Sequence, residues 1–350
     1  METWRGSVLV LLLLSLSLGV LAHGESGGRK HGYHSYSRSC PQAERIILDT
    51  LSKHAGWDRT IPAGVLRLHF HDCFVDVSSF TRFRFWFSNF AVLQGCDGSI
   101  LLDSTPTDGT KVEKLSLPNF MSARGFEMIE EAKQRLEAAC PGVVSCADTL
   151  AIAARDSTVM LGGKYYQVPT GRYDGRVSSQ ERGNTLPSPF SDASALIQNF
   201  KERGLSVQDL VVLSGGHTLG TAGCATFSNR LNNFTKTGKP DPTINPRYLS
   251  HLRRQCPAPG SPNRVELDKG SEFVFDNSYY KNLARRNGVL TSDQVLNEDS
   301  RTSHYVKNFA HKQHNFLSQF AASMVKMGYI GWKNKHNGEI RRVCSMVNTH

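Results

Sequence analysis

Apolar residues recur at helical spacing along most of the chain, whereas the alternation of apolar and polar positions typical of β-strands is scarce. In residues 125–140, Ile129, Leu136 and Ala139 fall on one stripe of a helix, and charged residues fall on the opposite side. No internal repeat or low-complexity linker interrupts the pattern. It predicts a mainly helical protein whose long loops are punctuated by glycine and proline.

Several segments also carry signals for helix ends. Ser206 and Asp209 are spaced as a capping box, and a Ser or Asp cap opens the helix that buries Leu196 and Phe200. We expect a glycine to close the helices in residues 191–204, 276–288 and 314–328, the last with Phe316, Phe320 and Met324 aligned. The helix that begins at Ser206 should end at the paired glycines Gly215 and Gly216.

The first 22 residues have the layout of a secretory signal peptide. Arg5 precedes an apolar run at 8–14, and Ala22 is a plausible cleavage point. A membrane anchor is the alternative, but serine and glycine interrupt the run, and a span needs about 20 apolar residues. We therefore expect cleavage, export and no later membrane attachment. The remainder, 23–350, is long enough for one large domain or two modest ones.

The net charge is +10, from 41 Lys and Arg against 31 Asp and Glu. In an exported chain this excess favours attraction to polyanions such as acidic cell-wall polysaccharide. A nucleic-acid partner is disfavoured, because the basic residues are scattered and the sequence has no nucleic-acid-binding motif.

All eight cysteines follow the predicted signal peptide, which indicates four disulfides. Spacing alone cannot choose among on the order of a hundred pairings. A zinc site is disfavoured because the chain has no CxxC pair. The sequence Asn233-Phe-Thr is a glycosylation acceptor, in agreement with export.

Residues 63–75 combine a cation and an imidazole on an otherwise apolar helix. Arg67 and His71 are four residues apart and share a face. Burial of an unpaired charge is costly, so the pair is either an exposed surface pair or a functional one. Zinc binding by His69 and His71 is disfavoured, because residues two apart point in different directions.

Two other features could hold a metal. His217 follows paired glycines at a helix end, where it is either a metal ligand or a capping residue. Asp-rich segments at 72–99 and 268–276 offer the hard oxygen ligands that calcium prefers, although neither matches an EF-hand.

These features occur within eight ordered motifs: RLHFHDCFV, QGCDGSILLD, SARGFEMIEEAK, CPGVVSCADTLAIAARD, VPTGRYDG, LSGGHTLG, FDNSYYKNL and TSDQ. Together with the eight cysteines, they resemble the secretory plant haem peroxidases of class III. The resemblance runs from about residue 35 to residue 347. It implies a single all-α peroxidase domain over 23–350, with haem b between a distal and a proximal half. The disulfides that it implies are Cys40–Cys140, Cys73–Cys96, Cys146–Cys344 and Cys224–Cys256.

On the proximal side the resemblance assigns His217 as the haem iron ligand. Asp293 would accept its other N–H and make the imidazole a stronger donor. Pro169 matches the residue at the exposed haem edge, where phenolic donors give up one electron at a time.

On the distal side the resemblance assigns His71 as the group that takes a proton from hydrogen peroxide and returns it to the departing oxygen. We expect its pKa to lie near working pH. Arg67 would stabilise the negative charge that develops as the O–O bond splits. Asn119 would accept the Nδ1 proton of His71, and Glu113 would connect this pair to a calcium site.

The family also carries two calcium ions. By position, the distal ion would be bound by Asp72, Val75, Gly95, Asp97 and Ser99, with Glu113 through water. The proximal ion would be bound by Thr218, Asp268, Ser271, Val274 and Asp276.

One segment departs from the family pattern. An 18-residue insertion, Asp76 to Leu93, holds five Phe and one Trp and separates Cys73 from Cys96. Such an apolar surface loop is a liability unless it is covered. We interpret it as a retained intron, with a functional insertion or a non-functional variant as the alternatives. If the segment is translated, we expect weaker distal calcium binding and a displaced Arg67–His71 helix.

The sequence therefore predicts an exported, monomeric, glycosylated peroxidase that uses hydrogen peroxide and small phenolic donors. A secreted haem-binding protein whose turnover is impaired by the insertion is the main alternative. An intracellular ascorbate-type enzyme conflicts with the signal peptide and the cysteines. A structural wall protein has no need for this set of catalytic residues.

Overall fold

The structure is a computed structural model that describes residues 36–75, 95–103 and 111–349. The predicted signal peptide at 1–22 and the insertion at 76–93 lie outside the described residues. The α-helices are α1 (Ala43–Trp57), α2 (Ile61–Cys73), α3 (Phe126–Ala139), α4 (Cys146–Met160), α5 (Gln180–Gly183), α6 (Ala193–Glu202), α7 (Val207–Ser214), α8 (Ser228–Asn232), α9 (Pro246–Gln255), α10 (Ser278–Ala284), α11 (Thr291–Glu298), α12 (Ser303–His311) and α13 (Gln313–Met327). The 3-10 turns are η2 (Ser99–Leu101), η3 (Glu113–Leu115), η4 (Gly215–Thr218), η5 (Cys224–Thr226) and η6 (Phe234–Lys236), and the strands are β1 (Thr221–Gly223) and β2 (Arg264–Glu266).

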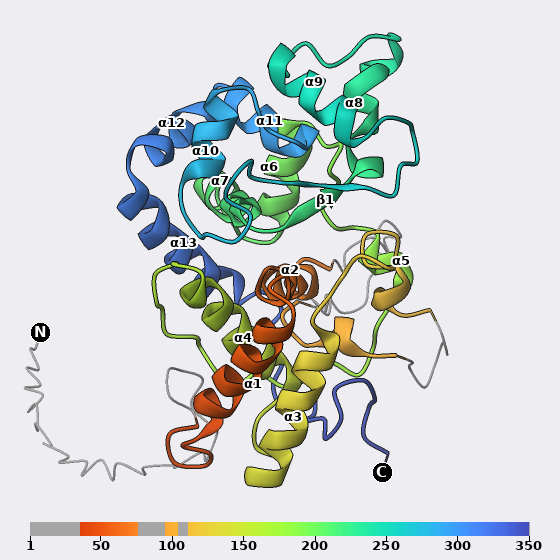
Figure 1. Ribbon diagram of the computed structural model, residues 1–350. Coiled ribbons are helices and arrows are strands. Elements are labelled where there is room, and N and C mark those ends of the chain that lie inside the picture. Colours follow the sequence, from red (N-terminus) through yellow and green to blue (C-terminus); the bar gives the residue numbers. More distant parts are fainter. Residues whose placement is uncertain (1–35, 76–94, 104–110, 350) are drawn as a thin grey trace, which may run out of the picture.

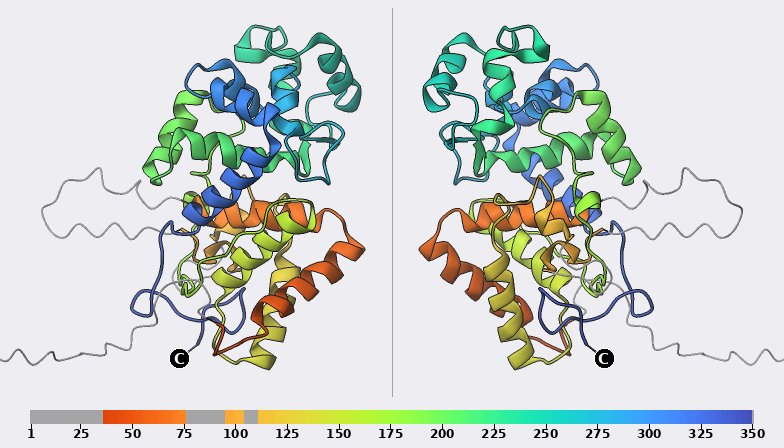
Figure 2. Two further views of the ribbon diagram at one scale, coloured as in Figure 1. Left: turned by 90° about the vertical axis from the view of Figure 1, so that its left-hand side faces the viewer. Right: turned by 90° about the vertical axis from the view of Figure 1, so that its right-hand side faces the viewer.

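Two helical halves meet at α2 (Figures 1 and 2). In the first half α2 packs along α4, and α1 packs against α3 and α4. In the second half α7 packs against α13, and α10 packs against α12. The two strands pair antiparallel in this second half and are the only strands among the described residues. The predicted all-α fold is confirmed.

The capping signals fix where two of the predicted helices begin. The Asp192 side chain accepts the N–H of Ala195 at the start of α6, and Ser206 and Asp209 form a reciprocal capping box at the start of α7. Each cap satisfies backbone N–H groups that have no partner within the helix. Because η4 follows α7 directly, the cap that fixes the start of α7 also helps to position the segment that carries His217.

The predicted apolar stripes are largely confirmed. Leu196 and Phe200 of α6 are buried, as are Phe316, Phe320 and Met324 of α13. These residues belong to one continuous core that covers both halves of the molecule.

The predicted stripe of α3 was wrong at its end. Ile129 and Leu136 are buried, but Ala139 is exposed, because the last turn of the helix extends beyond the core. The buried face instead includes Lys133, whose ammonium lies 2.6 Å from Oε1 of Glu137. A buried lysine is tolerated because its charge is paired.

All eight cysteines form disulfides. The pairs are Cys40–Cys140, Cys73–Cys96, Cys146–Cys344 and Cys224–Cys256, the set that the family resemblance implies. The Cys146–Cys344 bond returns the chain after α13 to the first half. Among the described helices, none combines the length and the apolar character needed to cross a membrane.

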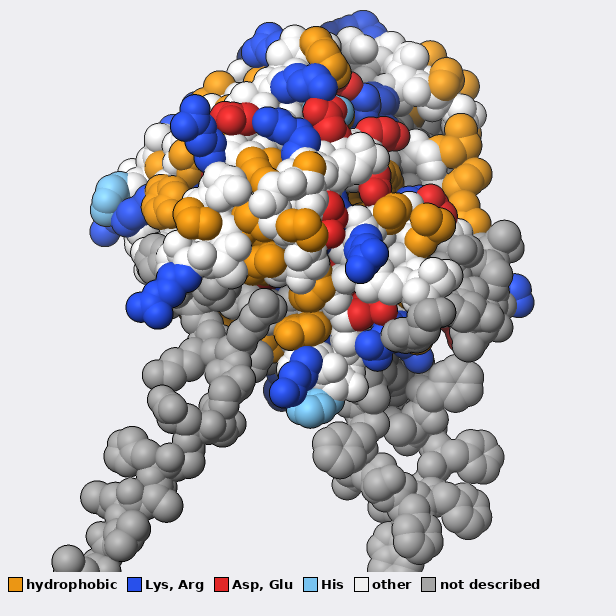
Figure 3. Space-filling model, turned by 90° about the horizontal axis from the view of Figure 1, so that it is seen from below, with side chains coloured by type: hydrophobic (Ala, Val, Ile, Leu, Met, Phe, Trp, Pro, Cys, Tyr) orange, Lys and Arg blue, Asp and Glu red, His pale blue; other side chains and the backbone are white. Residues whose placement is uncertain are grey.

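The charged side chains are dispersed on the face of the molecule seen from below. Lys and Arg lie there among acidic, apolar and uncharged polar groups (Figure 3). This face therefore presents a mixed surface instead of one large basic patch.

Candidate active site

Arg67 and His71 lie on one face of α2, as the four-residue spacing predicts. The Nε–H of Arg67 donates to Nε2 of His71 at 3.1 Å. His71 is buried, so the interpretation as an exposed surface pair is wrong. The neighbouring His69 points elsewhere, with Nδ1 3.7 Å from the sulfur of Cys73, which forms a disulfide.

The tautomer of His71 is fixed by Asn119. The Asn119 side-chain NH₂ donates to the backbone carbonyl of Glu113 at 2.8 Å, which turns its Oδ1 toward the imidazole. Nδ1 of His71 lies 2.5 Å from this oxygen and must carry the proton, because an amide oxygen only accepts. The lone pair of the neutral ring therefore lies on Nε2, beside Arg67.

One loop orients both distal side chains. The Arg67 guanidinium donates to the carbonyl oxygens of Pro118 at 2.8 Å and of Ser122 at 3.0 Å. The same loop carries Asn119, so Arg67 and His71 share a common support. Sequence reasoning missed Pro118 and Ser122 as part of the site, although both lie in or beside recognised motifs.

Burial dominates the electrostatics of this group. The pKa of His71 is lowered to about 3, mainly because burial removes the imidazolium from water and secondly because Arg67 is adjacent. Burial also lowers the pKa of Arg67 to about 10. The expectation that the His71 pKa lies near working pH thus differs from the structure, in which His71 is neutral over the whole physiological range.

His217 lies in η4, in the half of the molecule opposite His71. Its Nδ1–H donates to Oδ1 of Asp293 at 2.7 Å, and Oδ2 of Asp293 accepts the backbone N–H of Leu290. Asp293 is almost completely buried, whereas 41% of the His217 side chain is accessible. This places the lone pair of the neutral ring on Nε2, the nitrogen that is left to bind a metal.

The two histidines come from the two halves that meet at α2. His217 lies close enough to His71 to make a small electrostatic contribution to the lowered pKa of His71. A Cβ added at Gly216 would lie 3.9 Å from the side chains of Leu66 in α2 and Phe320 in α13, so η4 runs directly against the distal helix. Two imidazoles, each with its Nδ1 hydrogen-bonded and its Nε2 left as the ligand or base nitrogen, fit the donor set that a haem requires.

Three buried carboxylates gather beyond Asn119. Burial and mutual repulsion raise the pKa values of Asp72 and Glu113 well above their ordinary values, and burial raises that of Asp97. Within the described residues, Oδ2 of Asp97 and Oε1 of Glu113 have no hydrogen-bond partner. The Ser99 hydroxyl donates to Glu113 at 3.2 Å, and the ammonium of Lys333 lies 3.6 Å from Asp97. Buried carboxylates in excess over nearby cations fit a calcium ion.

Two glycines allow this cluster to form. A Cβ at Gly95 would lie 2.3 Å from the carbonyl oxygen of Ile330, and one at Gly175 would lie 2.5 Å from Oδ2 of Asp97. Only glycine permits these close approaches. The Gly95 carbonyl accepts the N–H of Asp97, while Val75 is buried just beyond the end of α2.

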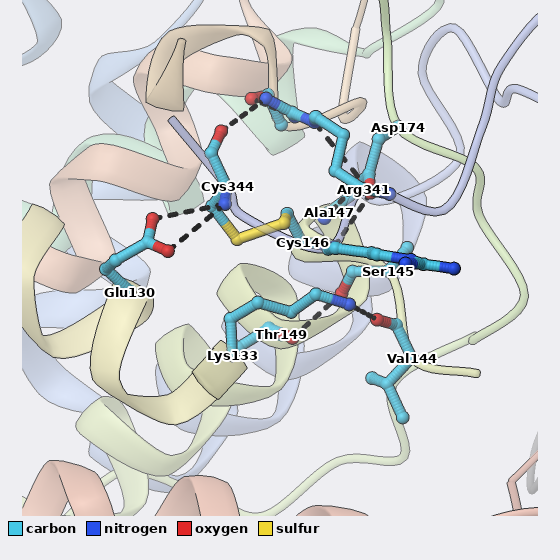
Figure 4. The surroundings of a disulfide bond; sticks show 12 residues. Glu130, Lys133, Val144, Ser145, Cys146, Ala147, Thr149, Asp174, Arg341 and Cys344 are labelled. Atoms are coloured by element: carbon cyan, nitrogen blue, oxygen red, sulfur yellow. Dashed lines mark hydrogen bonds and ion pairs between the residues drawn. A yellow bond between two sulfur atoms is a disulfide. The ribbon is translucent and has the colours of Figure 1, made fainter. Parts of the chain in front are cut away.

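A C-terminal network braces the same cluster (Figure 4). The buried Arg341 guanidinium donates to the carbonyl oxygens of Gly98 and of Cys344, the partner of Cys146. Asp174 accepts the backbone N–H groups of Cys146 and Arg341. The Cys146–Cys344 disulfide is thus connected to the turn that follows Asp97.

A second oxygen cluster begins one residue after His217. The Thr218 hydroxyl donates to Asp268 at 2.7 Å, and it lies 3.4 Å from the carbonyl of Val274 and 3.5 Å from Asp276. The Ser271 hydroxyl reaches the same carbonyl. Burial raises the pKa of Asp268 to about 6, with Asp276 adding repulsion. The five predicted proximal ligands therefore converge on one place.

Two further predicted residues, Pro169 and Asn233, make contacts of their own. Pro169 is buried, and its carbonyl accepts from Arg172, which also pairs with Asp148. Asn233 is exposed, and its Oδ1 accepts the N–H of Gly238.

The comparisons agree with this architecture. A family model described as peroxidase matches residues 47–312. The chain is 45% identical over 351 residues to "Peroxidase 71" of Arabidopsis thaliana, covering 98% of each chain. The chain belongs to the class III plant peroxidase family. It is also 43% identical to "Peroxidase 25" of Arabidopsis thaliana, over 99% of this chain and all of the relative, and 44% identical to "Peroxidase N1" of Nicotiana tabacum, over 97% and 96%.

The described flanks of the insertion are intact in this peroxidase. α2 is continuous to Cys73, the Cys73–Cys96 disulfide is formed, and His71 reaches Asn119. The expectation of a displaced Arg67–His71 helix stays a prediction. The similarity to plant peroxidases over nearly the whole chain does not favour the alternative of an impaired haem-binding protein.

Proposed function

We propose that this peroxidase holds haem b between His217 and His71, reduces hydrogen peroxide to water and oxidises small phenolic donors by one-electron steps. The observation that carries the proposal is a pair of imidazoles from the two halves, each with its tautomer fixed by a partner of its own: Asn119 for His71 and Asp293 for His217. In each neutral ring Nε2 is thereby the nitrogen that carries the lone pair.

On the proximal side, Nε2 of His217 would hold the iron. The bound haem would take up the two oxidising equivalents of hydrogen peroxide and pass them to the phenolic donors one at a time. Asp293 draws on the Nδ1–H of His217, which increases the electron-donating strength of the imidazole. Because Asp293 is buried, water does not compete for this hydrogen bond.

On the distal side, Nε2 of His71 accepts a proton from hydrogen peroxide. In the structure, Nε2 of His71 accepts a hydrogen bond from the Nε–H of Arg67, and hydrogen peroxide would replace Arg67 as the donor. His71 then returns the proton to the departing oxygen, which leaves as water. The guanidinium of Arg67 stabilises the negative charge on that oxygen, and its anchors at Pro118 and Ser122 hold it in place.

We further propose a calcium ion at each oxygen cluster. Asp72, Val75, Gly95, Asp97 and Ser99 would bind the distal ion, with Glu113 through water; Thr218, Asp268, Ser271, Val274 and Asp276 would bind the proximal ion. A divalent ion neutralises the repulsion that raises these carboxyl pKa values. Each site adjoins a functional histidine in sequence, so ion binding supports both sides of the junction.

Export, glycosylation at Asn233, a monomeric state and attraction to acidic wall polysaccharide complete the proposal. The exposed Asn233 and the net charge of +10 support it. Pro169 is proposed to contribute to the donor edge, as its motif implies.

An absorption spectrum of the purified full chain tests the proposal. A Soret band in the wild type, its loss in His217→Ala and its retention in His71→Leu are expected, together with peroxide-dependent oxidation of guaiacol by the wild type only. His251→Ala, a half-buried histidine of α9, is the matched control and should behave as the wild type does. Retention of an unchanged Soret band in His217→Ala would contradict the assignment.

A further inference from the structure

A third donor reaches the carboxylate that orients His217. The Tyr279 hydroxyl donates to Oδ1 of Asp293 at 3.0 Å, and this is the same oxygen that accepts the His217 N–H at 2.7 Å. The other oxygen accepts the backbone N–H of Leu290. The charge of Asp293 is therefore divided among three donors.

Tyr279 is held firmly in this position. It lies in α10, is 1% exposed, and packs edge-on against the His217 ring with 6.3 Å between the ring centroids. Tyr280 also packs against Tyr279 in a T-shaped arrangement, with 5.0 Å between the ring centroids. Burial and the nearby Asp293 charge raise the Tyr279 pKa well above its ordinary value, so the hydroxyl keeps its proton and remains a donor.

We propose that Tyr279 is a positioning residue that sets the donor strength of His217 by competing for Oδ1 of Asp293. A carboxylate oxygen that already accepts one proton is a weaker acceptor for the second. His217 then keeps more of the character of a neutral imidazole and stabilises ferric iron less. The inference rests on the proposed binding of haem by His217.

The neighbouring Tyr280 provides a matched control. It lies in the same helix, is fully buried, and also donates a hydrogen bond through its hydroxyl. Its acceptors, however, are the backbone carbonyls of Val211 and Val212 in α7. Removal of this hydroxyl costs a comparable buried hydrogen bond without touching Asp293.

The test compares Tyr279→Phe and Tyr280→Phe in the haem-loaded full chain. Resonance Raman spectra of the ferrous protein give the iron–imidazole stretching frequency, and titration against a redox dye gives the reduction equilibrium. We expect Tyr279→Phe to raise the frequency and to lower the equilibrium constant for reduction roughly fivefold, the equivalent of about 1 kcal/mol for one neutral hydrogen bond. Neither quantity should move in Tyr280→Phe. Wild-type values in Tyr279→Phe would overturn the proposal.

Incorporation of 3-fluorotyrosine gives a second test that does not depend on the folding of Tyr279→Phe. The fluorinated phenol is more acidic and therefore a stronger hydrogen-bond donor to Asp293. In both the wild type and Tyr280→Phe, fluorination should therefore lower the iron–imidazole frequency and raise the equilibrium constant for reduction, the reverse of the change expected for Tyr279→Phe. An unshifted wild type would overturn the role of Tyr279. Absence of an iron–imidazole band in the unsubstituted wild type would instead overturn the proposed haem ligation, and this inference with it.

Discussion

Nδ1 of His71 lies 2.5 Å from Oδ1 of Asn119, and this contact determines which nitrogen of the imidazole can act as a base. The amide cannot turn over without losing its hydrogen bond to the carbonyl of Glu113. The distal group is thus ordered by a short chain of side-chain and backbone contacts before any substrate arrives.

The first prediction follows from this chain. Asn119→Leu should lower the second-order rate with hydrogen peroxide roughly tenfold, the equivalent of one hydrogen bond, because the tautomer of His71 is no longer fixed. His71→Leu should cost about 10²–10⁴-fold. Stopped-flow measurements should find the double variant no slower than His71→Leu. Additive losses would show that Asn119 acts independently of His71.

The second prediction concerns pH. Burial and the adjacent Arg67 charge lower the His71 pKa to about 3, although the hydrogen bond to Asn119 acts in the opposite direction. The rate with peroxide should therefore stay constant from pH 7 to about pH 4 and fall below that, as the base becomes protonated. Arg67→Leu should move this acid limb to higher pH. A wild-type midpoint near pH 6 would contradict the buried, neutral state.

The same lowered pKa has a consequence for stability. Between about pH 3 and the ordinary histidine value, the unfolded chain binds more protons at His71 than the folded chain does. The contribution of His71 to stability is therefore present near neutral pH and is lost as the pH falls. His69, whose pKa burial also lowers to about 3, adds to this trend.

The third prediction concerns calcium. Chelation by EGTA should lower the melting temperature of the wild type, because Asp72, Asp97 and Glu113 then repel one another in a buried site. Glu113→Gln should melt higher than the wild type in EGTA, and should gain less from added calcium. Glu127→Gln, on the exposed side of α3, is the control and should leave both responses unchanged. An equal response of all three proteins would argue against a distal ion.

The fourth prediction concerns the cap that leads to His217. Ser206→Ala removes the acceptor for the Asp209 N–H and should lower the free energy of unfolding by about 1 kcal/mol. Ser250→Ala, an exposed substitution in the interior of α9, should cost less. Denaturant titration followed by circular dichroism measures both. Equal effects would show that the cap is not what stabilises α7.

The fifth prediction concerns the C-terminal brace. Replacement of Cys146 and Cys344 by serine should lower the free energy of unfolding by about 2–5 kcal/mol. It should also weaken calcium binding, because Arg341 connects Cys344 to Gly98 beside Asp97. Removal of the Cys224–Cys256 bond, which lies in the other half, is the control. It should lower stability but leave the distal ion bound, as measured by calcium titration.

The sequence by itself determined the helices and the chemistry that they carry. Spacing of four placed Arg67 and His71 on one face, and a capping box located the start of α7, because both signals act within one or two turns of a helix. The ordered motifs indicated the partners of His71 and His217 through family resemblance. The helical pattern wrongly predicted that Ala139 is buried, because burial at the end of a helix depends on how far the core extends.

Only the tertiary structure decided the quantities that depend on segments far apart in the chain. It placed Tyr279 on the same oxygen of Asp293 that His217 uses, and it buried His71 so deeply that its pKa lies far from working pH. The burial of a side chain and the sharing of a hydrogen-bond acceptor depend on every residue packed around it. Most of these residues are far away in the sequence, so the spacing of residues within one helix cannot predict either property.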